Sequence, residues 1–444
     1  MARIVCARVV SGLFVGFCAL TMAGCDDSPD DPSLVKTEEA KENVELPPVP
    51  ADGPKLGALA DVTPVLDRPG AQGRQIGYLH AGAQVPRTEE PFSKDGCPGG
   101  FYPIFPMGVV CAGQIATTDL SHPTLVAMAL EPKLDQPLPY TYARTRKSTP
   151  LFKRDPNQET AVVEAGTVSQ RSGMAVVGSW SALDPEGKMQ RLGMLTNGLF
   201  VKAADLQAAE PSEFVGVELN KDVALPVAFV VKRGVRAWRV EGGEPDKLGK
   251  LEYHDRLMLT GRFRTVKGHQ YWAVDDGRFV RHRDVTIVRR RNVFPDFAQP
   301  DQKWIDISVI TGTAVLYEGH RPIFTTLVSV GRDRLGDPKT SASTALGTFP
   351  IVGKHVTAAK LSPKGLAAYF EIYDLPWAME LGSGQLMHGA YWHDRFGIEH
   401  GPGNIQFSPG DARMIWNWAT PEVPAGWHGV NQPGTLQTLV HVRK

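Results

Sequence analysis

A glycine-rich segment near the C-terminus contains the side chains whose types could do chemistry. His388, His393 and His400 lie within thirteen consecutive positions, and a neutral imidazole can accept a proton or bind a metal. Their spacing matches no common metal-binding pattern, so we predict no metal and no cofactor. Ser408 follows, and a serine hydroxyl activated by His400 would be a nucleophile. The proline directly after Ser408 favours instead the role of a helix N-cap for this serine.

Cysteine, the more reactive nucleophile, is absent from this segment. The chain has five cysteines. Cys6 and Cys18 fall in an N-terminal targeting segment and Cys25 ends that segment, which leaves Cys97 and Cys111. In an oxidising compartment outside the cytoplasm we predict a disulfide between these two, closing a loop of about 15 residues worth about 3 kcal/mol. A reactive thiol pair is the alternative.

The N-terminus reads as an export signal. Arg3 and Arg8 precede an apolar run over residues 9–20, which is too short to span a membrane comfortably. The tetrapeptide Met-Ala-Gly-Cys ending at Cys25 resembles the lipobox of bacterial lipoproteins, and that resemblance implies a lipidated cysteine as the mature N-terminus. An ordinary signal peptide with an incidental cysteine is the alternative. We predict a signal peptide over 1–24 and an exported chain that is held to a membrane by the lipid at Cys25 and faces the periplasm or cell wall, at either the inner or the outer membrane.

Composition limits the possible partners and indicates which parts of the chain can fold. Lysine and arginine number 48, aspartate and glutamate also 48, so the net charge predicts no nucleic-acid partner. Apolar residues make up 42% of the chain, enough for packed cores. Residues 25–55 are acidic and proline-rich, and we predict a disordered tether there.

Three similar segments follow, which we place at residues 56–132, 133–210 and 211–298. Each has short apolar runs separated by Gly, Asp, Asn and Pro, the strand-and-turn signal of small β-barrels. The segments resemble bacterial SH3-like modules, and another β-rich assembly is the alternative. Their recurring landmarks are an opening near Thr63, Thr149 and Arg236, and a closing strand after Gly108, Gly198 and Gly277.

Modules of this kind in exported proteins commonly bind cell-wall peptides or glycans, although they can also be spacers. Trp180, Trp238 and Trp272 could line a groove, but we favour the core for these rings. Basic residues crowd the end of the third segment, and such a run is usually a solvated face or an interdomain contact. They are Arg278, Arg281, Arg283, Arg289, Arg290 and Arg291.

Residues 299–444 carry a more specific pattern. Strand-like stretches begin at Trp304, Ala314 and Val328, and the sequence Met-His-Gly-Ala-Tyr-Trp-His begins at Met387. In this order the stretches resemble the catalytic domain of L,D-transpeptidases of the YkuD type. The resemblance covers about 304–442 and implies a β-sandwich with a few short helices. We therefore predict a mostly β protein: tandem small SH3-like barrels followed by an L,D-transpeptidase-like domain.

The resemblance also implies a chemistry that this chain lacks. In the family a cysteine thiolate attacks a peptidoglycan stem peptide, a histidine takes the thiol proton, and backbone donors hold the oxyanion. The family motif Ser-His-Gly-Cys lies some sixteen residues after the first His-Gly, which here begins at His388. An ungapped alignment therefore places the nucleophile at Asn404 and the base at Pro402. A carboxamide is a poor nucleophile, and proline has no proton acceptor.

We therefore predict a cell-wall-associated pseudoenzyme that binds stem peptides without cleaving them. One alternative is an active transpeptidase or carboxypeptidase that uses an unconventional residue. Another is a structural lipoprotein that binds a protein partner of unknown identity. The predicted cleft consists of His388, Gly389, Tyr391, Trp392, His400, Gly401, Gly403 and Asn404.

Overall fold

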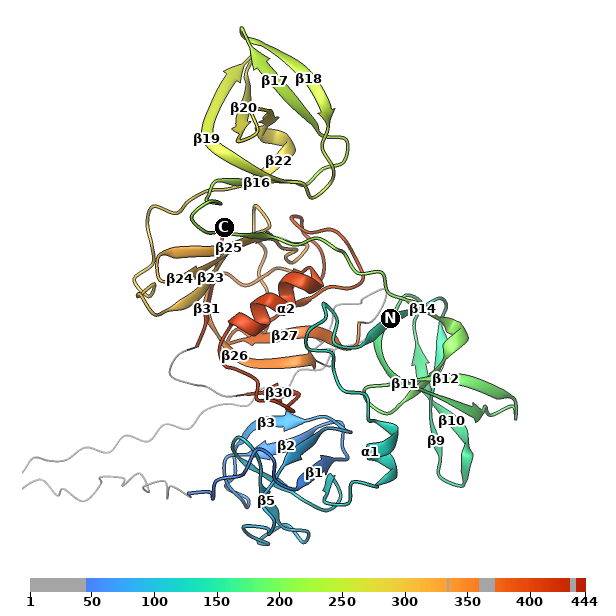
Figure 1. The fold of residues 1–444 in the computed structure, drawn as a ribbon. Coiled ribbons are helices and arrows are strands. Elements are labelled where there is room, and N and C mark those ends of the chain that lie inside the picture. The colour runs from blue at the N-terminus through green and yellow to red at the C-terminus, as the bar shows by residue number, and fades with distance from the viewer. Residues whose placement is uncertain (1–44, 334, 359–371, 432–436) are drawn as a thin grey trace, which may run out of the picture. The chain divides into compact units, whose positions relative to one another are not determined.

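The computed structural model describes residues 45–333, 335–358, 372–431 and 437–444. The predicted signal peptide (1–24), the lipidation site Cys25 and most of the predicted tether lie outside these residues. Within them, no helix is long and apolar enough to cross a bilayer. The described chain is mostly β, as predicted, and consists of three small β-modules and a larger C-terminal domain (Figure 1).

The first β-module has seven short strands and is followed by helix α1 (Pro123–Ala127). A disulfide joins Cys97 to Cys111, with the two Cα atoms 5.9 Å apart. The strands are β1 (Lys55–Ala58), β2 (Thr63–Leu66), β3 (Gln75–Leu79), β4 (Gln84–Pro86), β5 (Phe101–Pro103), β6 (Val109–Cys111) and β7 (Ala116–Thr117).

The second and third β-modules have longer strands, and each has a 3-10 turn before its last strand. The second contains β8 (Thr141–Thr145), β9 (Thr149–Asp155), β10 (Gln158–Val168), β11 (Gly173–Leu183), β12 (Met189–Leu195), β13 (Phe200–Lys202), η1 (Ala203–Asp205) and β14 (Leu206–Ala208). The third contains β16 (Val227–Val230), β17 (Arg236–Glu241), β18 (Glu244–Lys250), β19 (Arg256–Val266), β20 (His269–Val274), β21 (Phe279–Arg281), η2 (His282–Asp284) and β22 (Val285–Val288).

The second and third modules share one strand order. Numbered within each module, it is third, second, sixth, fifth, fourth, first, seventh. The first module has the same order in two pieces, β3-β2-β6-β5 and β4-β1-β7, which a single bridge between Arg87 and Ile104 connects. The landmark glycines Gly108, Gly198 and Gly277 precede the sixth strand of each module, with φ of 83°, 75° and 84°. Glycine adopts such left-handed angles without strain, which explains why the turn recurs with this residue.

The C-terminal domain is built from two sheets that share the long strand β26 (Gly347–Ala358). The first half of β26 pairs with β31 and the second half with β27 and β30. The remaining elements are β23 (Lys303–Ser308), β24 (Thr313–Glu318), β25 (Arg321–Leu327), β27 (Leu375–Leu381), β28 (Leu386–Gly389), β29 (Ile405–Phe407), α2 (Pro409–Trp418), β30 (Gly429–Val430) and β31 (Leu439–Arg443). Figure 1 shows α2 lying against β27.

Helix α2 begins where the sequence predicted. The Ser408 hydroxyl accepts a hydrogen bond from the Asp411 backbone amide, and Pro409 occupies the first helical turn. Both features satisfy or remove amides that would otherwise lack partners at a helix start. Ala412, Ile415 and their neighbours then face the core between the sheets.

Two boundaries differ from the predicted ones. Strand β1 begins at Lys55 and Leu46 packs beside the disulfide, so ordered structure starts inside the range assigned to the tether. Strand β15 (Val217–Glu218) lies in the range assigned to the third module, but it pairs with β25 of the C-terminal domain. Apolar side chains in both stretches find partners that are distant in sequence, which composition alone does not indicate.

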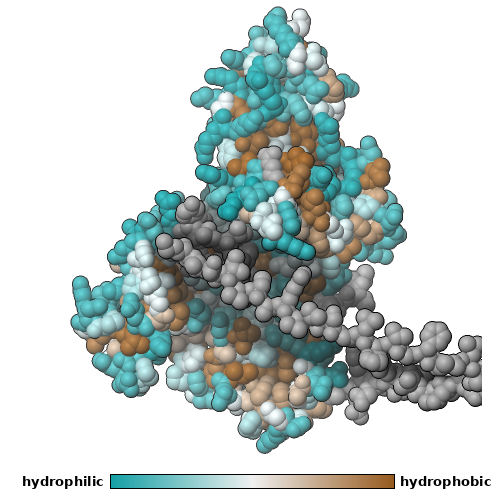
Figure 2. Space-filling model, turned by 180° about the vertical axis from the view of Figure 1, so that it is seen from behind, coloured by the Kyte–Doolittle hydropathy of each residue, from teal (hydrophilic) through white to brown (hydrophobic). Residues whose placement is uncertain are grey.

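The tryptophans of the modules behave mainly as core residues. Trp238 and Trp272 are buried in the third module, and Trp180 is half-buried against the core of the second. On the face seen in Figure 2, hydrophilic side chains cover much of the tip of the third module, at the top. The rings therefore supply packing, as favoured from the sequence.

Candidate functional site

Asn404 lies directly before β29, at the position that the family resemblance assigns to the nucleophile. Its side-chain oxygen Oδ1 accepts a hydrogen bond from the Leu386 backbone amide at 3.2 Å. Strands β28 and β29 run parallel there, with His388 opposite Gln406. The carboxamide therefore ties two strands together, and neither of its heavy atoms is a nucleophile comparable to a thiolate.

The preceding loop is packed tightly on its neighbours. Pro402 is exposed between Gly401 and Gly403, whose φ angles of 96° and 103° lie in the left-handed region. The Gly403 carbonyl accepts a hydrogen bond from the Thr344 hydroxyl at 2.8 Å. A Cβ atom on Gly403 would lie 2.8 Å from the Ser343 carbonyl oxygen. The loop thus requires glycine at both positions, and its exposed residue has no group that could accept a proton.

His388 is buried and neutral. Its side chain is 1% exposed, and burial lowers its pKa to about 4. Nδ1 lies 3.0 Å from the Gly389 carbonyl oxygen, so Nδ1 carries the proton and donates it there. The Trp392 ring lies 5.6 Å away, centroid to centroid. The imidazole is therefore held by the protein in one tautomer within an apolar setting.

His393 has both ring nitrogens engaged. Nε2 lies 2.6 Å from the Gln406 side-chain oxygen, and Nδ1 accepts a hydrogen bond from the Arg395 backbone amide at 3.0 Å. An amide oxygen only accepts, so the proton is on Nε2. Burial lowers the pKa of His393 to about 3. This histidine therefore has no free lone pair with which to activate a nucleophile.

Gln406 connects the histidines, and sequence reasoning did not single it out. Its amide nitrogen donates to the His400 carbonyl oxygen at 3.0 Å, while its oxygen binds His393. The side chain is 1% exposed. We call His388, His393, His400 and Gln406 the imidazole cluster. A glutamine inside a short apolar strand was the available signal, because a buried amide needs partners.

The remaining predicted site residues divide into those near Asn404 and those facing elsewhere. His400 is half-buried, with a pKa lowered by burial, and its ring lies 4.4 Å from that of His393. No described hydrogen bond joins it to Ser408, whose hydroxyl caps α2. Tyr391 is buried against Tyr142 of the second module, with ring centroids 4.4 Å apart. Tyr391 therefore contributes to an internal contact, in contrast to its predicted place in a ligand cleft.

Among the described residues, no group of three or more His, Cys, Asp or Glu side chains could hold a metal ion. In the imidazole cluster, the polar contacts of His393 and Gln406 are made within the protein. Burial lowers the pKa of each of the three histidines, so the described side chains around Asn404 form a neutral surface at pH 7.

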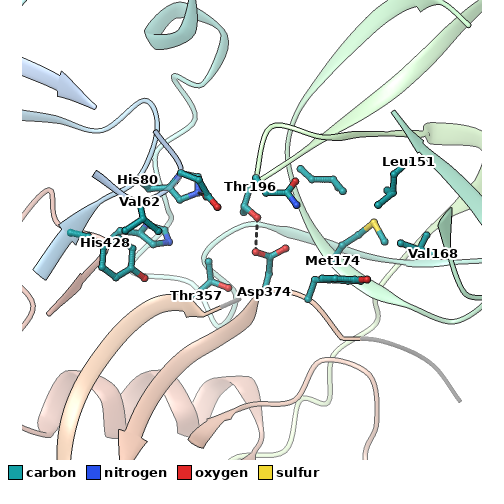
Figure 3. Close-up of a pocket in the computed structure, with 14 residues that line it drawn as sticks. Val62, His80, Leu151, Val168, Met174, Thr196, Thr357, Asp374 and His428 are labelled. Carbon is teal, nitrogen blue, oxygen red and sulfur yellow. Dashed lines mark hydrogen bonds and ion pairs between the residues drawn. The ribbon is translucent and has the colours of Figure 1, made fainter. Parts of the chain in front are cut away.

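A separate cavity of about 140 Å³ lies where the first two modules meet the C-terminal domain (Figure 3). The Asp374 carboxylate accepts hydrogen bonds there from the Thr196 hydroxyl at 2.6 Å and the Ala175 amide at 3.1 Å. Burial raises the pKa of Asp374. Apolar side chains such as Met174 line the opposite wall. None of the predicted site residues lines this cavity.

Comparison with known families agrees with the architecture of the C-terminal region. Residues 302–440 match the YkuD family, described as the L,D-transpeptidase catalytic domain. The match falls on the region in which the motifs predicted a resemblance to this family. Among curated proteins, none matches the chain.

Several solved structures that resemble part of the chain are L,D-transpeptidases. One from Stackebrandtia nassauensis is 17% identical, with 32% of this chain and 56% of that chain covered and a TM-score of 0.23. One from Xylanimonas cellulosilytica is also 17% identical, with 34% and 65% covered and a TM-score of 0.23. Mycobacterium tuberculosis L,D-transpeptidase 1 is 18% identical, with 52% and 99% covered and a TM-score of 0.23. The chain therefore spans less than two thirds of the first two proteins.

Proposed function

We propose that this chain is a non-catalytic, peptidoglycan-associated member of the L,D-transpeptidase family, tethered to a membrane through Cys25. Its partner would be the stem peptide of peptidoglycan, the partner kind that the family implies. The C-terminal domain contains no cysteine, since all five cysteines lie at or before position 111. Acyl transfer of the family type needs a thiolate. Without one, the domain could still bind a stem peptide but could not cleave it by this mechanism.

The observation that carries this proposal is the state of the site around Asn404. The carboxamide oxygen holds the Leu386 amide, and the neighbouring imidazoles of His388 and His393 are neutral and engaged in internal hydrogen bonds. A general base must be free to accept a proton from the nucleophile. His393, with both ring nitrogens engaged, cannot do so, Pro402 has no acceptor, and His388 is 1% exposed, so that its ring is shielded from solvent.

One stretch of the chain offers polar and aromatic surface to a peptide. It contains the half-buried residues Trp392, His400 and Asn404 and the exposed Pro402. Such a surface can recognise an extended peptide through hydrogen bonds and ring contacts. The proposed lipid at Cys25 and the chain that follows it would hold this surface within reach of the cell wall.

A catalysis assay tests the non-catalytic part of the proposal. The purified chain is incubated with disaccharide tetrapeptides and an amine acceptor, and mass spectrometry follows both substrate and protein. We expect unchanged tetrapeptide and no acyl adduct. Release of the fourth residue, or a covalent adduct on the chain, would establish the alternative of an active enzyme with an unconventional nucleophile.

A sedimentation assay tests the binding part. Purified sacculi are pelleted with the chain and with Asn404→Trp, which places a large ring at the proposed contact. The matched control is Asn157→Trp, in the exposed turn between β9 and β10. We expect the parent and the control to pellet equally, and Asn404→Trp to pellet several-fold less. Equal pelleting of all three would favour binding through the β-modules, and no pelleting at all would favour a protein-binding lipoprotein.

A further inference from the structure

A cleft rich in arginine lies between the end of the third module and the sheet of the C-terminal domain. Its volume is about 560 Å³. One wall is formed by β22 and the residues that follow it, including Arg289 and Arg290. The other wall is formed by β23 and β24 with Arg443 from the last strand. The basic run noted in the sequence therefore lines the same cleft as Arg443, which is distant from it in the sequence.

Charge in this cleft is strongly one-sided. Arg289, Arg290, Arg291 and Arg443 line it, and Asp306 is the one carboxylate among the described lining residues. The lining thus has an excess of three positive charges, while the whole chain is balanced. A concave surface with one sign of charge concentrates the field and attracts anions. We call these five residues the basic cleft.

Asp306 orients two of the arginines. Its side chain is 4% exposed. It accepts hydrogen bonds from Arg291 Nη1 at 3.0 Å, and from Arg443 Nε at 2.9 Å and Nη2 at 3.0 Å. A buried carboxylate with two guanidinium partners fixes their planes and reduces the entropy lost when they bind a ligand.

Arg289 and Arg290 supply the unneutralised charge. Both side chains are exposed, and neither forms an ion pair with a carboxylate among the described residues. The Arg289 guanidinium lies over the Trp272 ring, 5.2 Å from its centroid, which restricts its orientation. The cleft thus contains two guanidinium groups that Asp306 orients and two that have no carboxylate partner among the described residues. This arrangement favours binding of an anion with several oxygen atoms.

Neutral donors complete the lining. Thr311 and Thr313 contribute hydroxyls that lie 2.8 Å apart, and Ser308 lies beside them on the same wall. Guanidinium groups match phosphate oxygens in paired hydrogen bonds, and hydroxyl groups can donate to the remaining oxygen. A phosphate monoester carries more charge and more acceptor oxygens than a carboxylate, and a phosphodiester carries at least as much charge and as many oxygens. A phosphate group therefore fits the excess of three charges and the several donors better than a carboxylate does.

We propose that the basic cleft binds a phosphoryl group, carried either by an anionic lipid headgroup or by a soluble phosphate ester. This site is separate from the imidazole cluster and does not depend on stem-peptide binding. Its ligand would bind through Arg289 and Arg290, with Arg291 and Arg443 held in place by Asp306.

The test uses the full chain carrying Cys25→Ser, so that no acyl chain contributes to membrane binding. Calorimetry measures binding of glycerol 3-phosphate and of inorganic pyrophosphate. Sedimentation measures binding to vesicles of phosphatidylglycerol, with phosphatidylcholine vesicles for comparison. The cleft variant is Arg289→Gln with Arg290→Gln. The charge-matched control is Arg239→Gln with Arg262→Gln, two exposed arginines elsewhere on the third module.

We expect the cleft variant to bind the better of the two phosphate sources at least tenfold more weakly, and the control to change by less than twofold. Circular dichroism and thermal unfolding should be the same for both variants. Binding to phosphatidylglycerol vesicles that soluble phosphates displace assigns the lipid source, and binding of soluble phosphates alone assigns the free ester. Equal weakening in the two variants, or no binding by the parent to any probe, would overturn the proposal.

Discussion

The imidazole cluster and the basic cleft are both lined by polar side chains, yet they differ in how those side chains are used. In the imidazole cluster His393 has both ring nitrogens bonded within the protein and His388 is neutral and buried. In the basic cleft Arg289 and Arg290 carry charge with no carboxylate partner among the described residues. In the first region His393 and Gln406 therefore have their hydrogen-bonding groups engaged within the protein, whereas the second region has two charged side chains available for a ligand.

The difference shows that a match to a family fold and the chemistry of a site have to be argued separately. The C-terminal domain matches the family model over residues 302–440, and it contains α2 with its Ser408 cap. A fold of this kind is stabilised by burial and by hydrogen bonds that do not need the nucleophile. The fold can therefore form whether or not a nucleophile stands at position 404.

The largest expected effect comes from restoring the missing groups of the first region. Pro402→His together with Asn404→Cys should convert a chain with no covalent reactivity towards a carbapenem into one that forms an adduct, because a thiolate beside a base can attack the lactam. Intact-protein mass spectrometry measures the adduct. The single variant Asn404→Cys, which lacks the base, should react at least tenfold more slowly. An adduct on the parent chain would contradict the inactive assignment.

Acid should destabilise the imidazole cluster. Unfolded histidine has a pKa near 6.5, whereas burial holds the pKa of His388 at about 4 and that of His393 at about 3. Stability from these groups is complete above pH 6.5 and is lost as the pH falls towards the folded values. At pH 5 the free energy of unfolding should therefore be about 2 kcal/mol lower for each of the two histidines than it is at neutral pH.

The measurement is the urea midpoint at pH 7.5 and pH 5 for the parent and for His388→Gln. Between the two pH values, the free energy of unfolding of the variant should fall by about 2 kcal/mol less than that of the parent. The difference between the two proteins is the relevant quantity, because Asp411, with a pKa raised by burial to about 6, acts in the opposite direction. An identical fall in both proteins would show that His388 is accessible to protons in the folded state.

Removing the connecting amide should weaken the same region by a smaller amount. Gln406→Leu leaves the His393 Nε2–H and the His400 carbonyl without their partner, at an expected cost of about 2 kcal/mol. Thermal unfolding should show a midpoint several degrees lower. Gln270→Leu, at an exposed position in β20, is the matched control and should leave the midpoint nearly unchanged. Equal midpoints for the two variants would mean that the cluster is not rigidly held.

The smallest expected effect separates charge from geometry in the basic cleft. Arg289→Lys keeps the charge but loses the planar guanidinium over Trp272 and its paired hydrogen bonds. We expect phosphate binding about threefold weaker by calorimetry, which corresponds to about 0.6 kcal/mol. An unchanged affinity would mean that net charge alone attracts the anion.

Much of the fold could be predicted from local patterns. Short apolar runs between turn residues indicated the strands of the modules, and the proline after Ser408 indicated the start of α2. The landmark glycines marked equivalent turns in all three modules because their backbone angles suit glycine. The boundary near Val217 could not be predicted, since its partner strand β25 begins about a hundred residues later.

By itself, the sequence determined which reactive groups the C-terminal domain lacks, because the absence of a cysteine and the presence of Asn404 and Pro402 are properties of residue type. Only the tertiary structure decided which polar groups meet. Gln406 forms hydrogen bonds with both His393 and His400. Asp374 accepts a hydrogen bond from Thr196, 178 residues away in the sequence, and Asp306 accepts one from Arg443, 137 residues away. The physical reason is that backbone preference and burial act locally along the chain, whereas a hydrogen bond or ion pair requires two side chains that packing has brought within about 3 Å.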